Sequence, residues 1–185
     1  MTQDKLVSLV ILDRDGVINK DSDQYIKSPD DFKAIPGSID AIKMLSEKSI
    51  PVAIATNQSG IGRGFFSYAT VCTIHQKLFN LLGKHGDAIN YIAMCPHRPD
   101  QQCNCRKPKT GMLSEISDKL MIPLNKQVYF VGDSIKDIEA AKRAGCTPIL
   151  VKTGKTDLSR TPQYLSLKQQ GLIFNNLQQF AASII

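Results

Sequence analysis

The stretch VSLVILDRDGV, residues 7–17, joins an unbroken apolar run to two carboxylates. The run VSLVILD (7–13) is short and rich in β-branched residues, which is typical of a strand buried on both faces of a parallel sheet. Four further runs of this kind follow it along the chain: PVAIATN (51–57), INYIAMC (89–95), VYFVGD (128–133) and TPILV (147–151). We therefore predict a parallel sheet built from these five strands.

Helical patterns separate the predicted strands. Residues 38–48 place their apolar side chains on one helical face, with Ser38 as the expected N-cap. Residues 134–145 begin with Ser134 three positions before Asp137, a pairing that resembles a capping box, and they end at a glycine. Strands and helices that alternate in this way predict an α/β fold with a doubly wound, mostly parallel sheet of the Rossmann type.

The length of 185 residues fits one domain, 1–185, whose tail from Thr161 to Ile185 is expected to add a short strand and a helix. The apolar share of 42% and the charged share of 22% are those of a globular protein, and no apolar run is long enough to span a bilayer. The N-terminus shows no cationic leader followed by an apolar stretch. We therefore expect a cytoplasmic monomer with no membrane partner.

The net charge of +6 permits a nucleic-acid surface or an anionic small substrate. The basic residues are spread along the chain without a block of like charge. The aromatic share is 6% and Trp is absent, so the chain lacks the stacking residues that are typical of single-strand binding. We expect an anionic small molecule as the partner, and no nucleic acid.

Groups able to carry chemistry gather where the predicted strands end. Asp13 and Asp15 follow the first strand, and two carboxylates at this spacing can share a Mg²⁺ ion. The second strand runs into residues 56–59, a threonine, two amides and a serine that can donate to phosphoryl oxygens. Asp133 follows the fourth strand, and Asp137, one helical turn on, can complete a cation site. The carboxyl ends of parallel strands open into one crevice, where we expect these groups to converge.

Four motifs in this order resemble the haloacid dehalogenase superfamily of phosphatases: VILDRDGV, IATN, the lysine of CRKPKTG, and VYFVGDSIKD. The resemblance implies that Asp13 attacks phosphorus and carries the phosphoryl group as an aspartyl phosphate. It implies that Asp15 protonates the leaving oxygen and then activates water, so Asp15 should hold its proton more readily than Asp13 does. Thr56 and Lys107 would hold the phosphoryl oxygens, and Mg²⁺ would bind Asp13, the backbone carbonyl of Asp15 and Asp133.

The segment CPHRPDQQCNC, residues 95–105, holds three of the five cysteines and one of the three histidines. Its four soft ligands suit tetrahedral Zn²⁺: Cys95, His97, Cys103 and Cys105. Four protein ligands leave no open position for water, so the expected zinc is structural. A rigid zinc loop (95–105) would fix Arg106 and Lys107, which follow it directly.

The spacing of the motifs leaves no room for a large cap domain, since 42 residues lie between Asp13 and Thr56 and 50 between Thr56 and Lys107. Selectivity is therefore expected from short loops, at residues 19–27 and 58–64 and in the zinc loop. The motifs DRDGVIN, TNQSGIGRG, CPHRPD and CNCRKPKTGM resemble the heptose bisphosphate phosphatases of the superfamily. That resemblance implies a sugar bisphosphate substrate and these candidate contacts to it: Asn19, Asp21, Asn57, Gln58, Ser59, Arg63 and Arg106.

One departure and three alternatives accompany this interpretation. Ser134 stands where the heptose bisphosphate phosphatases often carry a lysine, which leaves the exact sugar open. A histidinol-phosphate phosphatase would share the fold and zinc loop, but its amine-bearing substrate calls for carboxylates rather than Arg63 and Arg106. A nucleic-acid 3′-phosphatase would need aromatic residues for base stacking, which the chain largely lacks. A non-enzymatic zinc-dependent interaction module would not need the set Asp13, Asp15, Thr56, Lys107 and Asp133.

The remaining chemically reactive side chains favour structural roles. His75 and His85 are expected to be surface or packing residues, and Cys72 and Cys146 to be small buried hydrophobic residues. Tyr25 follows the first motif and is expected to line the pocket or to cover it.

Overall fold

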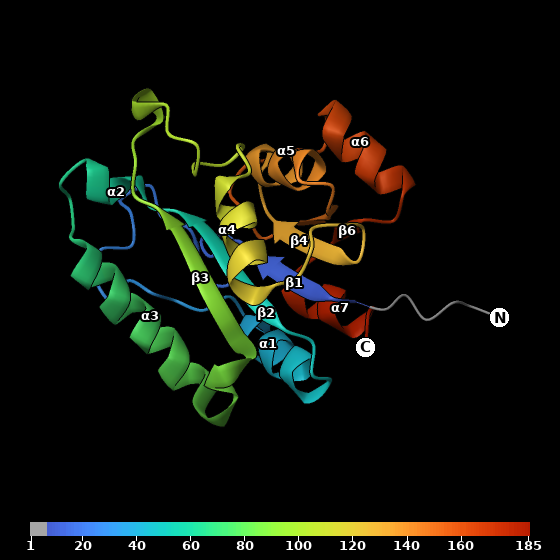
Figure 1. Ribbon diagram of the computed structural model, residues 1–185, viewed down its shortest axis with the longest axis horizontal. Coiled ribbons are helices and arrows are strands. Elements are labelled where there is room, and N and C mark those ends of the chain that lie inside the picture. Colours follow the sequence, from blue (N-terminus) through green and yellow to red (C-terminus); the bar gives the residue numbers. More distant parts are fainter. Residues whose placement is uncertain (1–6) are drawn as a thin grey trace.

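The computed structural model describes residues 7–185, so residues 1–6, on which part of the leader prediction rests, lie outside the described chain. Its centre is a six-stranded parallel sheet with the strand order β3-β2-β1-β4-β5-β6 (Figure 1). The strands are β1 (Leu9–Leu12), β2 (Val52–Asn57), β3 (Ile89–Cys95), β4 (Val128–Gly132), β5 (Thr147–Val151) and β6 (Ile173–Phe174). The five predicted strands and the doubly wound sheet are confirmed.

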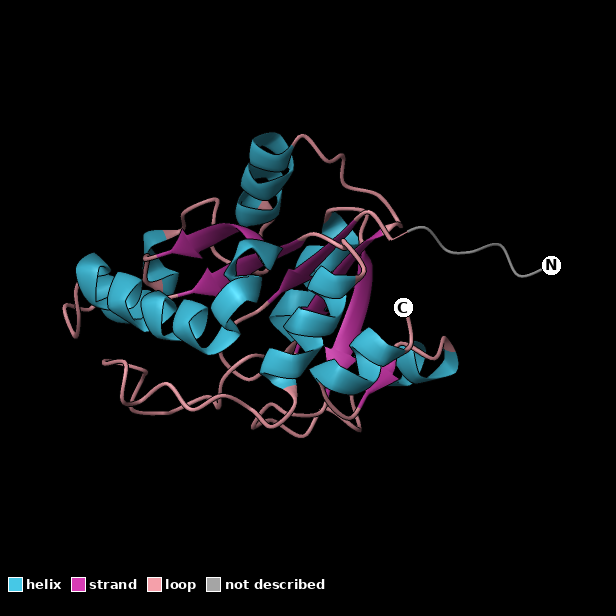
Figure 2. Cartoon of the chain, turned by 90° about the horizontal axis from the view of Figure 1, so that it is seen from below, coloured by secondary structure: helices cyan, strands magenta, loops and turns pink. Residues whose placement is uncertain are grey.

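Helices cover both faces of the sheet, as the view from below shows (Figure 2). One core cluster joins Val10 and Leu12 of β1 to α1 (Ser38–Glu47), α3 (Tyr68–Leu82) and α7 (Leu177–Ala182). The other joins Leu9 and Ile11 to α4 (Gly111–Leu120) and α5 (Ile135–Arg143). Alternate residues of one strand thus pack into two apolar layers, which is why β1 is apolar at all four positions. The shorter helices are α2 (Ser59–Gly62), α6 (Pro162–Gln169), η1 (Gly83–Ala88) and η2 (Pro99–Gln101).

The strand order places the carboxyl ends of β1 and β4 side by side at the switch point, where the chain stops adding strands on one side of β1 and begins to add them on the other. In open α/β sheets, ligands bind in the crevice at such a switch point. Across the described chain the connections at this edge are loops and short helices, and no cap domain stands over it. Within residues 7–185 no helix combines the length and the apolar content that a membrane crossing requires.

Several local predictions are corrected. Gly37 precedes α1 in the left-handed conformation, and the hydroxyl of Ser38 donates to the carbonyl of Ile18 at 2.7 Å instead of capping the helix. Cys72 is exposed, because it lies outside the face of α3 that buries Val71 and Ile74. The C-terminal tail holds two helices around β6, one more than predicted.

Other local predictions are confirmed. Asp137 accepts hydrogen bonds from the backbone N–H and the hydroxyl of Ser134, as the capping pattern predicts. Cys146 is buried, and His75 is a packing residue on the core side of α3. Burial and the charge of Arg14 lower the pKa of His75 to about 4.

Met121 at the C-terminus of α4 yields a test of this backbone description. It has a φ of 55°, and the residue is 88% exposed. Met121→Gly should raise the free energy of unfolding by about 0.5–1 kcal/mol in urea denaturation, because glycine adopts this conformation without strain and little packing is lost. Lys119→Gly, two residues earlier inside the helix, should lower it by about 1 kcal/mol. A Met121→Gly protein less stable than the native one would contradict the assignment.

Candidate active site

Three carboxylates converge at the switch point. Asp13 follows β1, Asp133 follows β4, and Asp137 lies in the first turn of α5. Oxygen atoms of all three lie within 4.8 Å of one another. Asp137 can approach so closely because residue 132 is a glycine, where a Cβ would lie 2.1 Å from the Cβ of Asp137. The sequence predicted that Asp137 could complete a cation site here, and in the structure its carboxylate lies beside those of Asp13 and Asp133.

The ammonium group of Lys107 lies among these acids. It is 2.8 Å from Asp13 Oδ1 and 2.8 Å from Asp137 Oδ1, and it donates to the carbonyl of Ala55 at 2.8 Å. The side chain is 2% exposed and passes over the ring of Phe130. Burial alone would lower the pKa of Lys107, but the two carboxylates raise it above its ordinary value. Lys107 is therefore a fixed positive charge.

The carboxylates carry more negative charge than one lysine can balance. Burial raises the pKa of Asp13 to about 7, against the opposing effect of Lys107. Burial also raises the pKa of Asp133 to about 8, and repulsion from Asp13 and Asp137 adds to the rise. A cluster of hard oxygen donors with excess negative charge is the donor set that Mg²⁺ prefers, so these residues fit such an ion.

Asp15 is held in a different way. The guanidinium of the fully buried Arg14 reaches Asp15 Oδ1 and Oδ2, each at 2.9 Å. The amides of Asn19 and Gln58 each donate to Asp15 at 2.8 Å. Burial alone would raise the pKa of Asp15, but Arg14 and these hydrogen bonds lower it below its ordinary value. The same amide of Gln58 donates to the hydroxyl of Thr56 at 2.8 Å, so it links the first two motifs.

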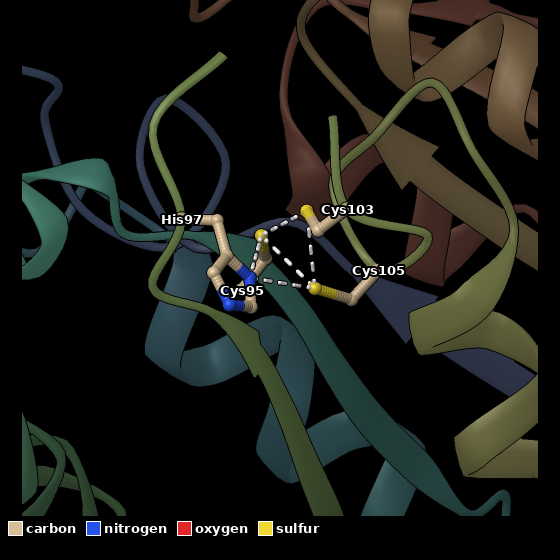
Figure 3. Close-up of side chains that lie close together, drawn as sticks. All are labelled: Cys95, His97, Cys103 and Cys105. Carbon is tan, nitrogen blue, oxygen red and sulfur yellow. Dashed lines mark hydrogen bonds between the residues drawn. The ribbon is translucent and has the colours of Figure 1, made fainter. Parts of the chain in front are cut away.

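The cysteine cluster forms a compact four-donor group (Figure 3). The three pairs of sulfur atoms are 3.2, 3.4 and 3.6 Å apart, and His97 Nδ1 lies 3.2 Å from the sulfur of Cys105. A tetrahedral zinc ion with Zn–S bonds of about 2.3 Å would separate its sulfurs by about 3.8 Å. The sulfur–sulfur distances are therefore close to those of a zinc site formed by Cys95, His97, Cys103 and Cys105.

The zinc loop is tied to the site at its far end. The guanidinium of Arg106 donates to the carbonyl of His97 at 3.3 Å. The backbone N–H of Lys107 donates to the side chain of Asn57 at 3.1 Å, and that amide donates back to the carbonyl of Lys107 at 3.3 Å. Asn57 thus holds the main chain from which the Lys107 side chain enters the site.

A pocket of about 260 Å³ opens over these groups. Its walls include these residues named from the sequence: Asp13, Asp15, Asp21, Tyr25, Asn57, Gln58, Arg106, Lys107 and Asp133. Thr56 and Asn19 are buried beneath the walls, where they contact Gln58 and Asp15. The structure does not bring Ser59 of α2 or the exposed Arg63 into the wall.

The wall also contains residues that the sequence did not single out, among them Lys136, Lys155 and Thr156. Lys155 lies 2.7 Å from Asp23 and 3.6 Å from Asp21, across the mouth of the pocket. It belongs to the loop after β5. The strand-end rule that identified the other groups would have identified this loop too, had it been applied to the run at 147–151.

The comparisons with known proteins agree with this arrangement. A family model described as HAD-hydrolase-like matches residues 104–180. The chain is 48% identical over 179 residues to D-glycero-beta-D-manno-heptose-1,7-bisphosphate 7-phosphatase of Pseudomonas putida, covering 97% of this chain and 100% of that protein. It is 39% identical over 159 residues to the protein of the same name from Escherichia coli, covering 82% of each.

A solved structure is also similar. The crystal structure of D,D-heptose 1,7-bisphosphate phosphatase from Bordetella bronchiseptica, complexed with magnesium and phosphate, matches with a TM-score of 0.83 and 43% identity. The match covers 96% of this chain and 97% of that one. The chain therefore belongs to the haloacid dehalogenase superfamily, and it is a phosphoric monoester hydrolase. Within that superfamily it resembles the heptose bisphosphate phosphatases, as its motifs predicted.

The crowding of carboxylates predicts a pH effect on stability. The pKa of Asp133 rises from 3.8 to about 8 on folding, so the folded protein binds the carboxyl proton more tightly than the unfolded chain does. The free energy of unfolding should therefore fall as the pH rises from about 4 to about 8. Asp133→Asn removes the titration. In chelator it should raise the free energy of unfolding by at least about 1 kcal/mol at pH 9 and change it little at pH 4, since one pKa unit corresponds to about 1.4 kcal/mol.

Thermal or urea unfolding across pH 4–9 measures this difference. Asp118→Asn, an exposed acid on α4, serves as the control and should leave the pH profile unchanged. An Asp133→Asn profile parallel to the native one would show that Asp133 does not titrate in this window.

Proposed function

We propose that the chain removes the 7-phosphate of D-glycero-D-manno-heptose 1,7-bisphosphate. The observation that carries the proposal is the position of Asp13, which lies in the pocket wall beside the ammonium of Lys107 and two further carboxylates. Relatives that carry this activity in their names align over nearly the whole chain. A nucleophile, a fixed cation and an acidic cation site are the groups that phosphoryl transfer requires.

The proposed reaction runs through a covalent intermediate. A carboxylate oxygen of Asp13 attacks phosphorus, and the bond from phosphorus to the sugar oxygen breaks. Asp15 gives its proton to that oxygen. Asp15 then takes a proton from water as the water attacks the aspartyl phosphate, which releases phosphate and restores Asp13. Lys107 balances charge on the phosphoryl oxygens during both steps.

The pKa values of the two acids bear on these roles. Among the protein's own charges, the pKa of Asp13 is raised and that of Asp15 is lowered, which is the reverse of the order that the roles need. Mg²⁺ bound by Asp13, Asp133 and the backbone carbonyl of Asp15 would neutralise charge and favour the ionised form of Asp13. A phosphate dianion beside Asp15 would raise the pKa of that acid. With substrate and cation both bound, the pKa of Asp15 would therefore lie above that of Asp13, as the proposed roles require.

Gln58 and Asn19 take positioning roles in this proposal. Both amides donate to Asp15, so they hold the acid toward the leaving oxygen instead of reading the sugar. Asp21 and Arg106 stay candidates for substrate contacts because both line the pocket. Arg106 suits the second phosphate, since a guanidinium binds such an anion through two parallel hydrogen bonds.

The zinc loop is proposed to be a structural support. Zn²⁺ held by Cys95, His97, Cys103 and Cys105 would fix a segment that has few apolar residues of its own. The carbonyl of His97 accepts from Arg106, so the support would extend to the substrate-facing cation. We further propose one domain over residues 1–185 and a role in supplying heptose for bacterial surface polysaccharide, while the cytoplasmic location and the monomeric state stay predictions.

A substrate comparison tests the function. The purified chain with Mg²⁺ should hydrolyse heptose 1,7-bisphosphate faster than histidinol phosphate or a 3′-phosphorylated oligonucleotide, and both anomers should be compared. Asp13→Asn should lower turnover at least about 1,000-fold, since it removes the attacking oxygen. Phosphate release at matched substrate concentrations is the measurement. Preference for histidinol phosphate would overturn the substrate assignment, and full activity of Asp13→Asn would overturn the mechanism.

Removal of each metal should have a different effect. Chelation of Mg²⁺ should abolish turnover while circular dichroism stays unchanged.

Removal of Zn²⁺, or the double change of Cys95 and Cys103 to Ser, should lower activity because Arg106 and Lys107 lose their support. It should also increase proteolysis within residues 95–107. Metal content is checked by atomic emission. Cys72→Ser is the matched control, since this exposed thiol lies outside the cluster. Full activity without bound zinc would contradict the supporting role.

A further inference from the structure

Asp133 differs from the other two carboxylates in what holds it. Asp13 accepts from the Arg14 backbone N–H at 2.7 Å and pairs with Lys107. Asp137 pairs with Lys107 and accepts from the Ser134 hydroxyl at 2.6 Å. Over residues 7–185, the Asp133 carboxylate has no hydrogen bond or ion pair to another residue. Its charged neighbours include the two other acids, whose repulsion favours turning it away.

Backbone contact from two loops confines Asp133 instead. A Cβ on Gly16 would lie 2.3 Å from Asp133 Oδ2, and a Cβ on Gly154 would lie 2.2 Å from the same oxygen. The Gly154 position is also 2.7 Å from the Cβ of Asp133, so rotation of the carboxylate alone would not clear it. Real side chains do not approach this closely. Asp133 keeps its place because both loops present bare backbone to it.

The loop that carries Gly154 is anchored on both sides of that residue. The Thr153 hydroxyl donates to the carbonyl of Gly16 at 2.6 Å. The ammonium of Lys155 lies 2.7 Å from Asp23. The two neighbours of Gly154 thus tie the loop after β5 to the segment after β1, and the backbone between them presses on Asp133.

We propose that Gly154 is a positioning residue that keeps the metal-binding carboxylate of Asp133 turned toward Asp13 and Asp137. The proposal rests on the magnesium-dependent function proposed above. Gly16 has a φ of +87°, which by itself favours glycine, whereas the φ of Gly154 lies outside the left-handed region. Contact with Asp133 is therefore the reason for glycine at position 154. A side chain there would displace Asp133 or lift the loop, and either movement would separate the oxygen ligands.

Direct Mg²⁺ binding tests the proposal without substrate. Calorimetric titration with MgCl₂ should give a dissociation constant for Gly154→Ala at least about tenfold above the native value, as loss of support around a metal ligand typically does. Turnover should recover at saturating Mg²⁺, and the thermal midpoint in chelator should stay close to the native one. The control is Gly86→Ala, whose Cβ would meet only Phe79 at 3.7 Å, and it should bind Mg²⁺ as the native chain does.

Two further variants keep the test decisive if Gly154→Ala does not fold. Thr153→Val removes the anchoring hydroxyl at nearly constant volume and should weaken Mg²⁺ binding several-fold, whereas Thr153→Ser should preserve it. Native affinity in Gly154→Ala, or in Thr153→Val where only that variant folds, would overturn the proposal and leave the phosphatase function standing. A native chain that bound no Mg²⁺ would overturn the proposal together with the metal dependence of that function.

Discussion

The buried ammonium of Lys107 is the interaction on which the site depends. The carboxylates of Asp13, after β1, and of Asp137, in α5, are largely buried side by side, and their repulsion would separate them without a cation between them. The same ammonium donates to the carbonyl of Ala55 on β2, so one atom joins β1, β2 and α5. Asp13, the proposed nucleophile, and Asp137 therefore keep their relative positions because of a side chain that belongs to none of these elements.

That side chain enters from the segment directly after the zinc loop, which gives the proposed zinc site a purpose although it lies away from the reacting groups. Of segment 95–107, only the cysteines pack against an apolar core, so we expect its shape to depend on the proposed metal bonds and on the paired hydrogen bonds between Asn57 and Lys107. Asn57 sits on β2, inside the sheet. The position of the lysine is thus fixed from the sheet on one side and, in our proposal, from the zinc site on the other.

The sequence predicts the strands well because each is a short, mainly apolar run, and it locates Asp13, Asp15 and Asp133 because strand ends have a fixed place in such a sheet. It predicts local capping poorly at Ser38, whose hydroxyl has a better partner in Ile18, distant in the sequence. The roles of Gln58 and Asn19 are also out of reach, since an amide near a site can donate to a substrate or to a neighbouring acid. Only the distances to Asp15 distinguish the two. The loop after β5 has no motif, and it contacts Asp133 through the backbone at Gly154.

The pocket mouth has one structural feature with evolutionary meaning. Its rim is bridged by Lys155 with Asp21 and Asp23, all on exposed loops that carry none of the groups proposed for bond cleavage. Changes at the side chains of Asp21, Asp23 and Lys155 can therefore accumulate without damaging the reaction centre below, provided that Thr153 and Gly154 in the loop after β5 are kept. Because substrate-facing side chains at the rim are separate from the reacting groups, gene duplicates can diverge in the substrate they recognise while they keep the same reaction centre.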